Sequence, residues 1–104
     1  MSAILNKEHI FKSILMNETE LKNMGVEKLA LFGSFVRNEQ SENSDIDFLV
    51  EFAKNQKNYD NYMNLLFFLE DLFKRKIDLL TPEAMSPYIG PYIIKELEYV
   101  SLSA

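Results

Sequence analysis

The sequence contains no cysteine, which excludes disulfide bonds and metal sites built from thiolates. It also has no long apolar run, because the longest, Leu65 to Leu69, is far too short to cross a membrane. Its first residues, MSAILNKEHIF, lack the basic segment and the following apolar segment of a signal peptide. We therefore expect a cytoplasmic protein with no membrane partner.

Positive charge is scarce as well, since 11 Lys and Arg residues stand against 16 Asp and Glu residues and the net charge is −5. Proteins bind nucleic-acid backbones largely through Lys and Arg, so we expect no direct nucleic-acid binding. An acidic chain is compatible with an anionic ligand brought in by a metal ion, or with a basic protein partner.

Apolar residues make up 47% of the 104 residues, enough for the core of a single domain, residues 1–104. Such a domain has a radius of gyration of about 13 Å. The apolar spacing predicts strands alternating with helices, which indicates an α/β or α+β fold with a small sheet. The predicted strands are 26–32, 45–52 and 76–80, and the predicted helices are 6–23, 34–37, 59–74 and 92–99, with an interruption at Gly90-Pro91.

The most informative segment runs from Gly33 to Phe52, GSFVRNEQSENSDIDFLVEF. A Gly-Ser turn is followed by a polar loop and then by Asp45 and Asp47 at the start of a strand. Alternate strand residues point to one face, so the two carboxylates can converge. Asp45, Asp47, Leu49 and Glu51 share that face, and the opposite face, which we expect to be buried under helices, carries Ile46, Phe48, Val50 and Phe52. Like charges about 4 Å apart repel by roughly 4 kcal/mol at an effective dielectric of about 20. The pair therefore predicts a bound cation, and oxygen ligands suit Mg²⁺ holding a nucleotide phosphate.

A third acid, Asp78, lies inside the short apolar strand KIDLL. This strand follows a helical crossover, so it can lie beside the strand of Asp45 and Asp47. Three converging carboxylates are what a two-metal site for phosphoryl or nucleotidyl transfer requires, and backbone N–H groups after Gly33 favour phosphate oxygens. Each element alone is most often structural, because Gly-Ser turns are common and single acids are usually solvated. The ordered set is far more specific.

This ordered set resembles the minimal nucleotidyltransferases of the DNA polymerase β superfamily, from about Val26 to Thr81. The matching residues are Gly33, Ser34, Arg37, Ser44, Asp45, Asp47 and Asp78. The resemblance implies a polymerase β-like nucleotidyltransferase fold with a mixed sheet flanked by helices, two Mg²⁺ ions and ATP as substrate.

The resemblance also implies a role for each matching residue. It assigns Gly33 and Ser34 to the triphosphate, and places Arg37 and Ser44 in the same nucleotide-binding motif. Asp45 and Asp47 would coordinate both metals. Asp78 would complete the metal site and help to deprotonate the acceptor hydroxyl.

Two neighbouring positions, Arg37 and Asn38, bear on the resemblance to the family motif. Arg37 has two readings, because a guanidinium suits both contact with phosphate and pairing with an acid of the loop. The family commonly has Gly after this Arg, whereas this chain has Asn38. Asn is the non-Gly residue that best adopts a left-handed conformation, so we expect the loop to keep its shape.

Short stand-alone members of this family are typically antitoxins encoded beside a HEPN-domain RNase toxin. The resemblance therefore implies an antitoxin that transfers AMP from ATP onto a tyrosine of its cognate HEPN toxin. The phenolate would attack the α-phosphate, and pyrophosphate would leave. Two alternatives remain, an antitoxin that acts by binding alone and a nucleotidyltransferase for a small molecule.

Three tyrosines near the C-terminus, Tyr88, Tyr92 and Tyr99, admit two interpretations. They form a partner-facing aromatic patch, or they pack in the ordinary way. We favour packing, because aromatic residues mostly build cores.

Overall fold

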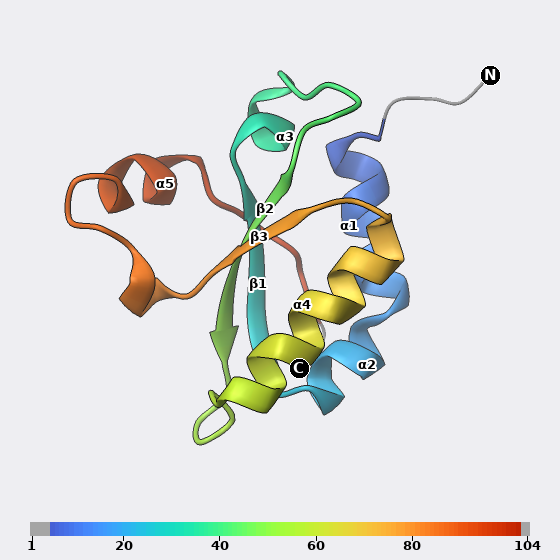
Figure 1. The fold of residues 1–104 in the computed structure, drawn as a ribbon, viewed down its shortest axis with the longest axis vertical. Helices are drawn as coiled ribbons and strands as arrows, with labels where there is room; N and C mark the ends of the chain where they lie inside the picture. Colours follow the sequence, from blue (N-terminus) through green and yellow to red (C-terminus); the bar gives the residue numbers. More distant parts are fainter. Residues whose placement is uncertain (1–4, 103–104) are drawn as a thin grey trace.

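The computed structural model describes residues 5–102, in which helices alternate with strands (Figure 1). The elements are α1 (Lys7–Met16), α2 (Glu18–Asn23), β1 (Val26–Phe32), α3 (Ser34–Arg37), β2 (Ile46–Phe52), α4 (Tyr59–Phe73), β3 (Ile77–Leu80), the 3₁₀ helix η1 (Pro82–Ala84), α5 (Gly90–Glu96) and β4 (Glu98–Tyr99). The predicted small mixed sheet with flanking helices is confirmed. The radius of gyration is 13.3 Å, close to the expected value.

The four strands form one sheet in the order β3-β2-β1-β4. β2 runs antiparallel to β1 and parallel to β3, and β4 runs antiparallel to β1. Asp47 lies opposite Phe32 of β1 on one side and opposite Asp78 of β3 on the other. The third predicted strand therefore lies beside the second, as expected. The end of β1 and the beginnings of β2 and β3 meet at one end of the sheet.

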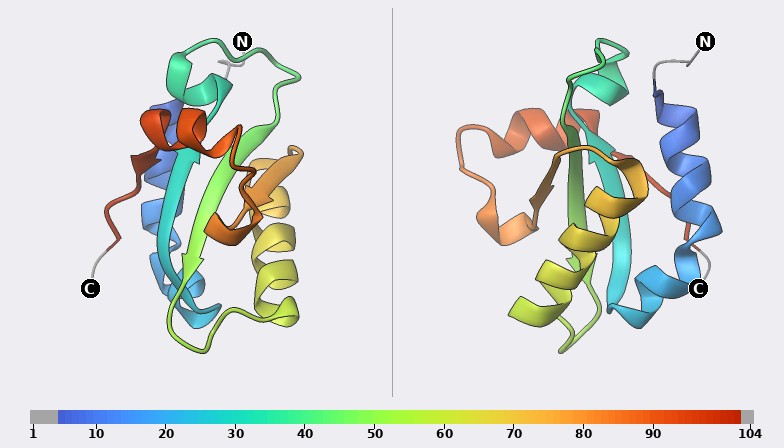
Figure 2. Two further views of the ribbon diagram at one scale, coloured as in Figure 1. Left: turned by 90° about the vertical axis from the view of Figure 1, so that its left-hand side faces the viewer. Right: turned by 45° about the vertical axis from the view of Figure 1, so that its right-hand side comes forward.

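Helices lie on both sides of the sheet, with α1, α2 and α4 on one side and α5 on the other (Figures 1 and 2). The core on the side of α1, α2 and α4 includes Ile10, Ile14, Leu21, Leu29, Leu31, Ile46, Phe48, Val50, Leu65 and Leu69. A smaller cluster joins Ala30, Phe32, Leu49 and Ile93. Full burial of such a side chain contributes about 1.5–3 kcal/mol, so the larger core dominates the stability of the sheet. The alternation predicted for β2 is confirmed, and it places Asp47 on the same face as Leu49, toward α5.

The single helix predicted over residues 6–23 is wrong, because two helices meet at Asn17. Asn17 has φ −116° and ψ 20°, and its side-chain amide donates to the carbonyl of Ser13 at 2.8 Å. Asparagine side chains compete in this way with the main-chain hydrogen bonds of a helix. The predicted start is confirmed, since the Asn6 side chain accepts from the N–H of His9 at 2.9 Å.

The C-terminal prediction also needs correction. Gly90 and Pro91 do not interrupt the chain but form the first turn of α5, where proline is well tolerated. The helix ends at Glu96, and residues 98–99 form β4 against the edge of β1. Val100 follows in the core and donates its N–H to the carbonyl of Leu29 at 2.9 Å. Pairing with a strand far away in the sequence therefore overrides the helical spacing.

The tyrosines near the C-terminus do not pack as we favoured. Tyr88 is 83% exposed and Tyr92 is 73% exposed, so the packing interpretation is wrong for both. Tyr99 is about half exposed, and its hydroxyl donates to the carboxylate of Glu51 at 3.1 Å. No helix among residues 5–102 has the length and apolar character needed to cross a membrane.

Candidate active site

The Gly-Ser turn lies directly at the end of β1. Gly33 has φ 81° and ψ −154°, a conformation that is essentially restricted to glycine. A methyl group on its α-carbon would overlap the carboxylate of Asp47. Glycine is thus required twice here, for the backbone angle and for the close approach of an acid from the neighbouring strand. Ser34 begins the short helix α3 and is partly buried.

The three predicted acids come from two neighbouring parallel strands. Asp47 and Asp78 are paired in register between β2 and β3, and Asp45 lies one residue before β2 begins. Asp47 is partly buried and Asp78 is exposed. The carboxylate of Asp45 lies 3.8 Å from the ammonium of Lys76. Within residues 5–102, no three His, Cys, Asp or Glu side chains are gathered closely enough in this conformation to hold a metal ion.

The electrostatic environment of Asp47 disfavours its charged form. The pKa of Asp47 is raised to about 6, chiefly by burial and then by the negative charges of Asp78 and Asp45. Arg37 acts against this increase and Glu96 adds to it. A divalent cation beside these carboxylates would remove the cost of the repulsion, and carboxylate oxygens are the ligands that Mg²⁺ prefers. The chemistry of these side chains therefore suits a magnesium ion, although among residues 5–102 their carboxylates are not gathered around one point in this conformation.

Arg37 is engaged with two carboxylates. Its Nε donates to Glu39 Oε1 at 2.8 Å, and its Nη1 donates to both carboxylate oxygens of Glu96, at 3.1 and 2.8 Å. Of the two readings of Arg37, the structure therefore contains the pairing with an acid of the loop. The second partner, Glu96 at the end of α5, also accepts from the backbone N–H of Gly33 at 3.0 Å. Sequence reasoning missed Glu96, because it lies 59 residues from Arg37 and belongs to no local motif.

The loop between α3 and β2 begins with a left-handed residue. Asn38 adopts the left-handed conformation with φ 59° and ψ 37°, as we expected of the residue that replaces the usual glycine. The N–H of the next residue, Glu39, returns to the carbonyl of Ser34 at 2.9 Å. The asparagine therefore closes the turn without glycine.

Ser44 and Arg75 hold the second half of this loop. The Ser44 hydroxyl accepts from the N–H of Ser41 at 2.8 Å, so in this structure it stabilises the loop itself. Arg75 donates from Nη1 to the carbonyls of Ser41 at 3.2 Å and Ser44 at 2.9 Å. Its guanidinium also lies 5.5 Å from the centre of the Phe35 ring. Arg75 was not singled out from the sequence, since a basic residue after a helix carries no specific signal.

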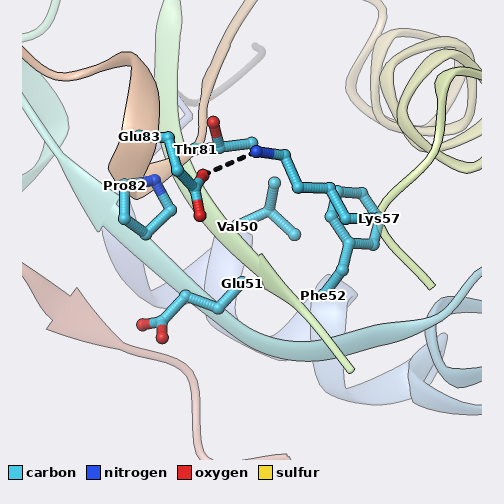
Figure 3. A pocket seen from close by; sticks show the side chains of 7 residues that line it. All are labelled: Val50, Glu51, Phe52, Lys57, Thr81, Pro82 and Glu83. Atoms are coloured by element: carbon cyan, nitrogen blue, oxygen red, sulfur yellow. Dashed lines mark hydrogen bonds and ion pairs between the residues drawn. The ribbon is translucent and has the colours of Figure 1, made fainter. Parts of the chain in front are cut away.

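Two hollows are found toward the other end of β2 and β3. One, of about 130 Å³, is lined by Val50, Glu51, Lys57 and Glu83 among others, and an ion pair between Lys57 and Glu83 crosses it at 2.8 Å (Figure 3). The second, of about 380 Å³, is lined by Tyr59, Tyr62 and Leu79 with their neighbours. None of the predicted site residues lines either hollow. The candidate active site is the end of the sheet where Gly33, Asp47 and Asp78 meet.

Comparison with known proteins gives the family. Residues 16–100 match the model of the nucleotidyltransferase domain. The chain is 42% identical over 91 residues to a Methanocaldococcus jannaschii protein named as a candidate protein adenylyltransferase, with 86% of each chain covered. It is 31% identical over 99 residues to the protein adenylyltransferase MntA of Thermococcus cleftensis, covering 94% of this chain and 99% of that one.

Solved structures share the fold. A protein described as a candidate minimal nucleotidyltransferase superposes with a TM-score of 0.77 at 22% identity, covering 93% of this chain and 98% of that one. A toxin–antitoxin structure with AMP-PNP has a TM-score of 0.66 at 21% identity, covering 95% and 75%. A Shewanella oneidensis complex of a tri-AMPylated HEPN toxin with an MNT antitoxin has a TM-score of 0.55 at 17% identity, covering 85% and 71%. The resemblance read from the Gly-Ser turn and the three acids is therefore confirmed: the chain belongs to the nucleotidyltransferase domain family and is a nucleotidyltransferase.

Proposed function

We propose that this protein is a cytoplasmic antitoxin that transfers AMP from ATP to a tyrosine of a cognate HEPN-domain RNase toxin. Relatives that cover most of the chain are named as protein adenylyltransferases, and proteins of the same fold occur with HEPN toxins. The observation that carries the proposal is the register of Asp47 opposite Asp78 next to Gly33, since this places two acids beside a backbone turn that only glycine can form.

In this proposal Asp45, Asp47 and Asp78 hold two Mg²⁺ ions. Asp78 is exposed and Asp45 is partly exposed, so rotation about their side-chain bonds can bring both carboxylates toward Asp47. When bound, Mg²⁺ would neutralise the charge that develops on the phosphoryl oxygens. Burial, and then repulsion from Asp78 and Asp45, raise the pKa of Asp47, and a bound cation would offset both effects.

The other motif residues would bind and orient the nucleotide. Gly33 and Ser34 offer backbone N–H groups to the triphosphate, and Arg37 would exchange a carboxylate partner for a phosphate oxygen. Ser44 would keep the loop before Asp45 in place through its contact with Ser41. The attacking tyrosine oxygen would form a bond to the α-phosphorus while the bond to the bridging oxygen breaks, and pyrophosphate would leave. Asp78, exposed to an incoming acceptor, would receive the phenolic proton.

The test is transfer of label from α-³²P-ATP in the presence of Mg²⁺ and the purified HEPN toxin encoded beside this protein. We expect label on the toxin, at a tyrosine located by mass spectrometry, and a loss of about 100-fold or more with Asp45→Asn/Asp47→Asn. Asp71→Asn is the matched control, because Asp71 is an exposed acid of α4 that pairs with Lys74.

Other outcomes separate the alternatives. A stable complex with the toxin but no label would favour an antitoxin that acts by binding alone. Label that appears on an added small alcohol or amine, but never on protein, would favour a small-molecule nucleotidyltransferase. Label on the toxin that persists in Asp45→Asn/Asp47→Asn would contradict the assigned metal residues.

A further inference from the structure

Glu96 links α5 to the groups proposed for the triphosphate. One oxygen of its carboxylate accepts from the backbone N–H of Gly33 at 3.0 Å and from Arg37 Nη1 at 3.1 Å. The other oxygen accepts from the same Arg37 nitrogen at 2.8 Å. The side chain of Glu96 is only 23% exposed, so this is a partly enclosed contact rather than a loose surface ion pair.

The Glu96 carboxylate has the chemistry of a phosphate oxygen pair. It is an anion that accepts from one backbone N–H and from a guanidinium, and phosphate is bound by the same kinds of donor. A donor that is occupied by a carboxylate is not free for a second anion. The Glu96 charge also opposes the approach of a further negative group, as its effect on the neighbouring carboxylate of Asp47 illustrates.

We propose that Glu96 occupies the phosphate-binding groups at Gly33 and Arg37 while no nucleotide is bound, and that it is displaced when a triphosphate enters. This inference rests on the proposed nucleotide-binding function and adds a regulatory residue to the same site. Glu96 thereby lowers the affinity for nucleotide and keeps the acidic site closed to weakly bound anions. Its removal should strengthen binding of any ligand that presents phosphate oxygens there.

The alternative is that Glu96 merely anchors α5. The buried side chain of Ile93 already attaches α5 to the smaller core, so the helix has a second anchor and Glu96 variants should fold. A purely structural role predicts a lower melting temperature for Glu96→Gln and an unchanged or weaker affinity for nucleotide. The two roles therefore predict different signs for the change in affinity.

The experiment measures binding of ATP with Mg²⁺ by isothermal titration calorimetry to the wild-type protein, Glu96→Gln and Glu96→Ala. We expect the dissociation constant to fall by about threefold to tenfold in both variants, the size that loss of a partly exposed competing ion pair allows. Glu39→Gln is the matched control, since Glu39 also pairs with Arg37, whereas the backbone N–H of Gly33 donates to Glu96. Its effect should be clearly smaller.

Two further probes define the site. Inorganic pyrophosphate should gain affinity in Glu96→Gln as ATP does, whereas adenosine, which has no phosphate, should not. An unchanged or weaker affinity for ATP in Glu96→Gln would overturn the role of Glu96 while leaving the proposed function in place. If ATP bound neither the wild type nor any variant, the proposed function would fall together with the inference.

Discussion

The α-carbon of Gly33 faces the carboxylate of Asp47 so closely that a single added methyl group would overlap that carboxylate. The contact joins the end of β1 to the beginning of β2, which are adjacent in the sheet. The Gly-Ser turn and Asp47 therefore have one shared geometry. A change at either residue acts on the other.

Replacement of Gly33 by alanine tests this relationship. We expect Gly33→Ala to reduce the free energy of unfolding by about 1–3 kcal/mol, because the positive φ with extended ψ is strained for any residue with a β-carbon. Urea denaturation measures this loss. The matched control is Gly90→Ala in α5, where the added β-carbon would meet Met85 Cβ at 3.5 Å, an ordinary contact. Equal stability of the two variants would contradict the requirement for glycine at position 33.

The raised pKa of Asp47 predicts a stabilising substitution in the candidate active site. With EDTA present at pH 7.5, Asp47→Asn should increase the free energy of unfolding by about 1–2 kcal/mol, a value reduced for the partial exposure of the site. The native pKa of about 6 lies above the ordinary aspartate value of 3.8, so protonation favours the folded state. The advantage of Asp47→Asn should therefore shrink as the pH falls through 6 and vanish below about 4.

Urea denaturation at pH 7.5, 6 and 4 follows this change. Asp71→Asn carries the same change of charge at an exposed position and should show no comparable gain. A gain for Asp47→Asn that is the same at every pH would contradict an origin in the ionisation of Asp47.

Magnesium should stabilise the folded protein through the same acids. A ligand that binds only the native state adds about 1.4 kcal/mol at ten times its dissociation constant, which raises the melting temperature by a few degrees in a small domain. We expect this rise with millimolar MgCl₂ in the wild type and its loss in Asp47→Asn and Asp78→Asn. Differential scanning fluorimetry against NaCl at equal ionic strength makes the measurement. A rise that persists in both variants would place the magnesium elsewhere.

Asn38 provides a test of the loop. Because its φ is 59°, Asn38→Gly should preserve both stability and nucleotide binding, whereas Asn38→Val should cost about 1–2 kcal/mol, since a β-branched residue is strained in this region. Chemical denaturation and ATP titration compare the two variants. Tolerance of valine would show that the left-handed turn at Asn38 does not control the loop that leads to Asp45.

Local patterns in the sequence were sufficient for several elements. The predicted range of β1 is the observed one, and α3, β2, α4 and β3 begin and end within one residue of their predicted limits. The apolar residues of these elements recur with a clear period, and turn residues mark element ends, as Gly33 does for β1. The shared face of Asp45 and Asp47 was predictable for the same reason, since the spacing of residues on one strand fixes which side chains share a face.

Other features depend on residues that are distant in the sequence. The change from helix to strand after Glu96 follows from pairing with β1, whereas the break at Asn17 has a local cause, a side-chain hydrogen bond to Ser13 that the apolar spacing does not reveal. The exposure of Tyr88 and Tyr92 depends on where α5 lies against the sheet. Sequence spacing alone therefore gave wrong limits for the last helix and wrongly favoured packing for Tyr88 and Tyr92.

By itself, the sequence determined the family and the strands β1, β2 and β3, and it pointed to three acids as site candidates, because these follow from local spacing and turn chemistry. Only the tertiary structure decided that Asp47 lies opposite Asp78, that Arg75 holds the loop before Asp45, and that Glu96 reaches Gly33. Each of these contacts joins residues about 30 to more than 60 positions apart. Such contacts form only when helices and strands pack, so their geometry is a property of the folded chain.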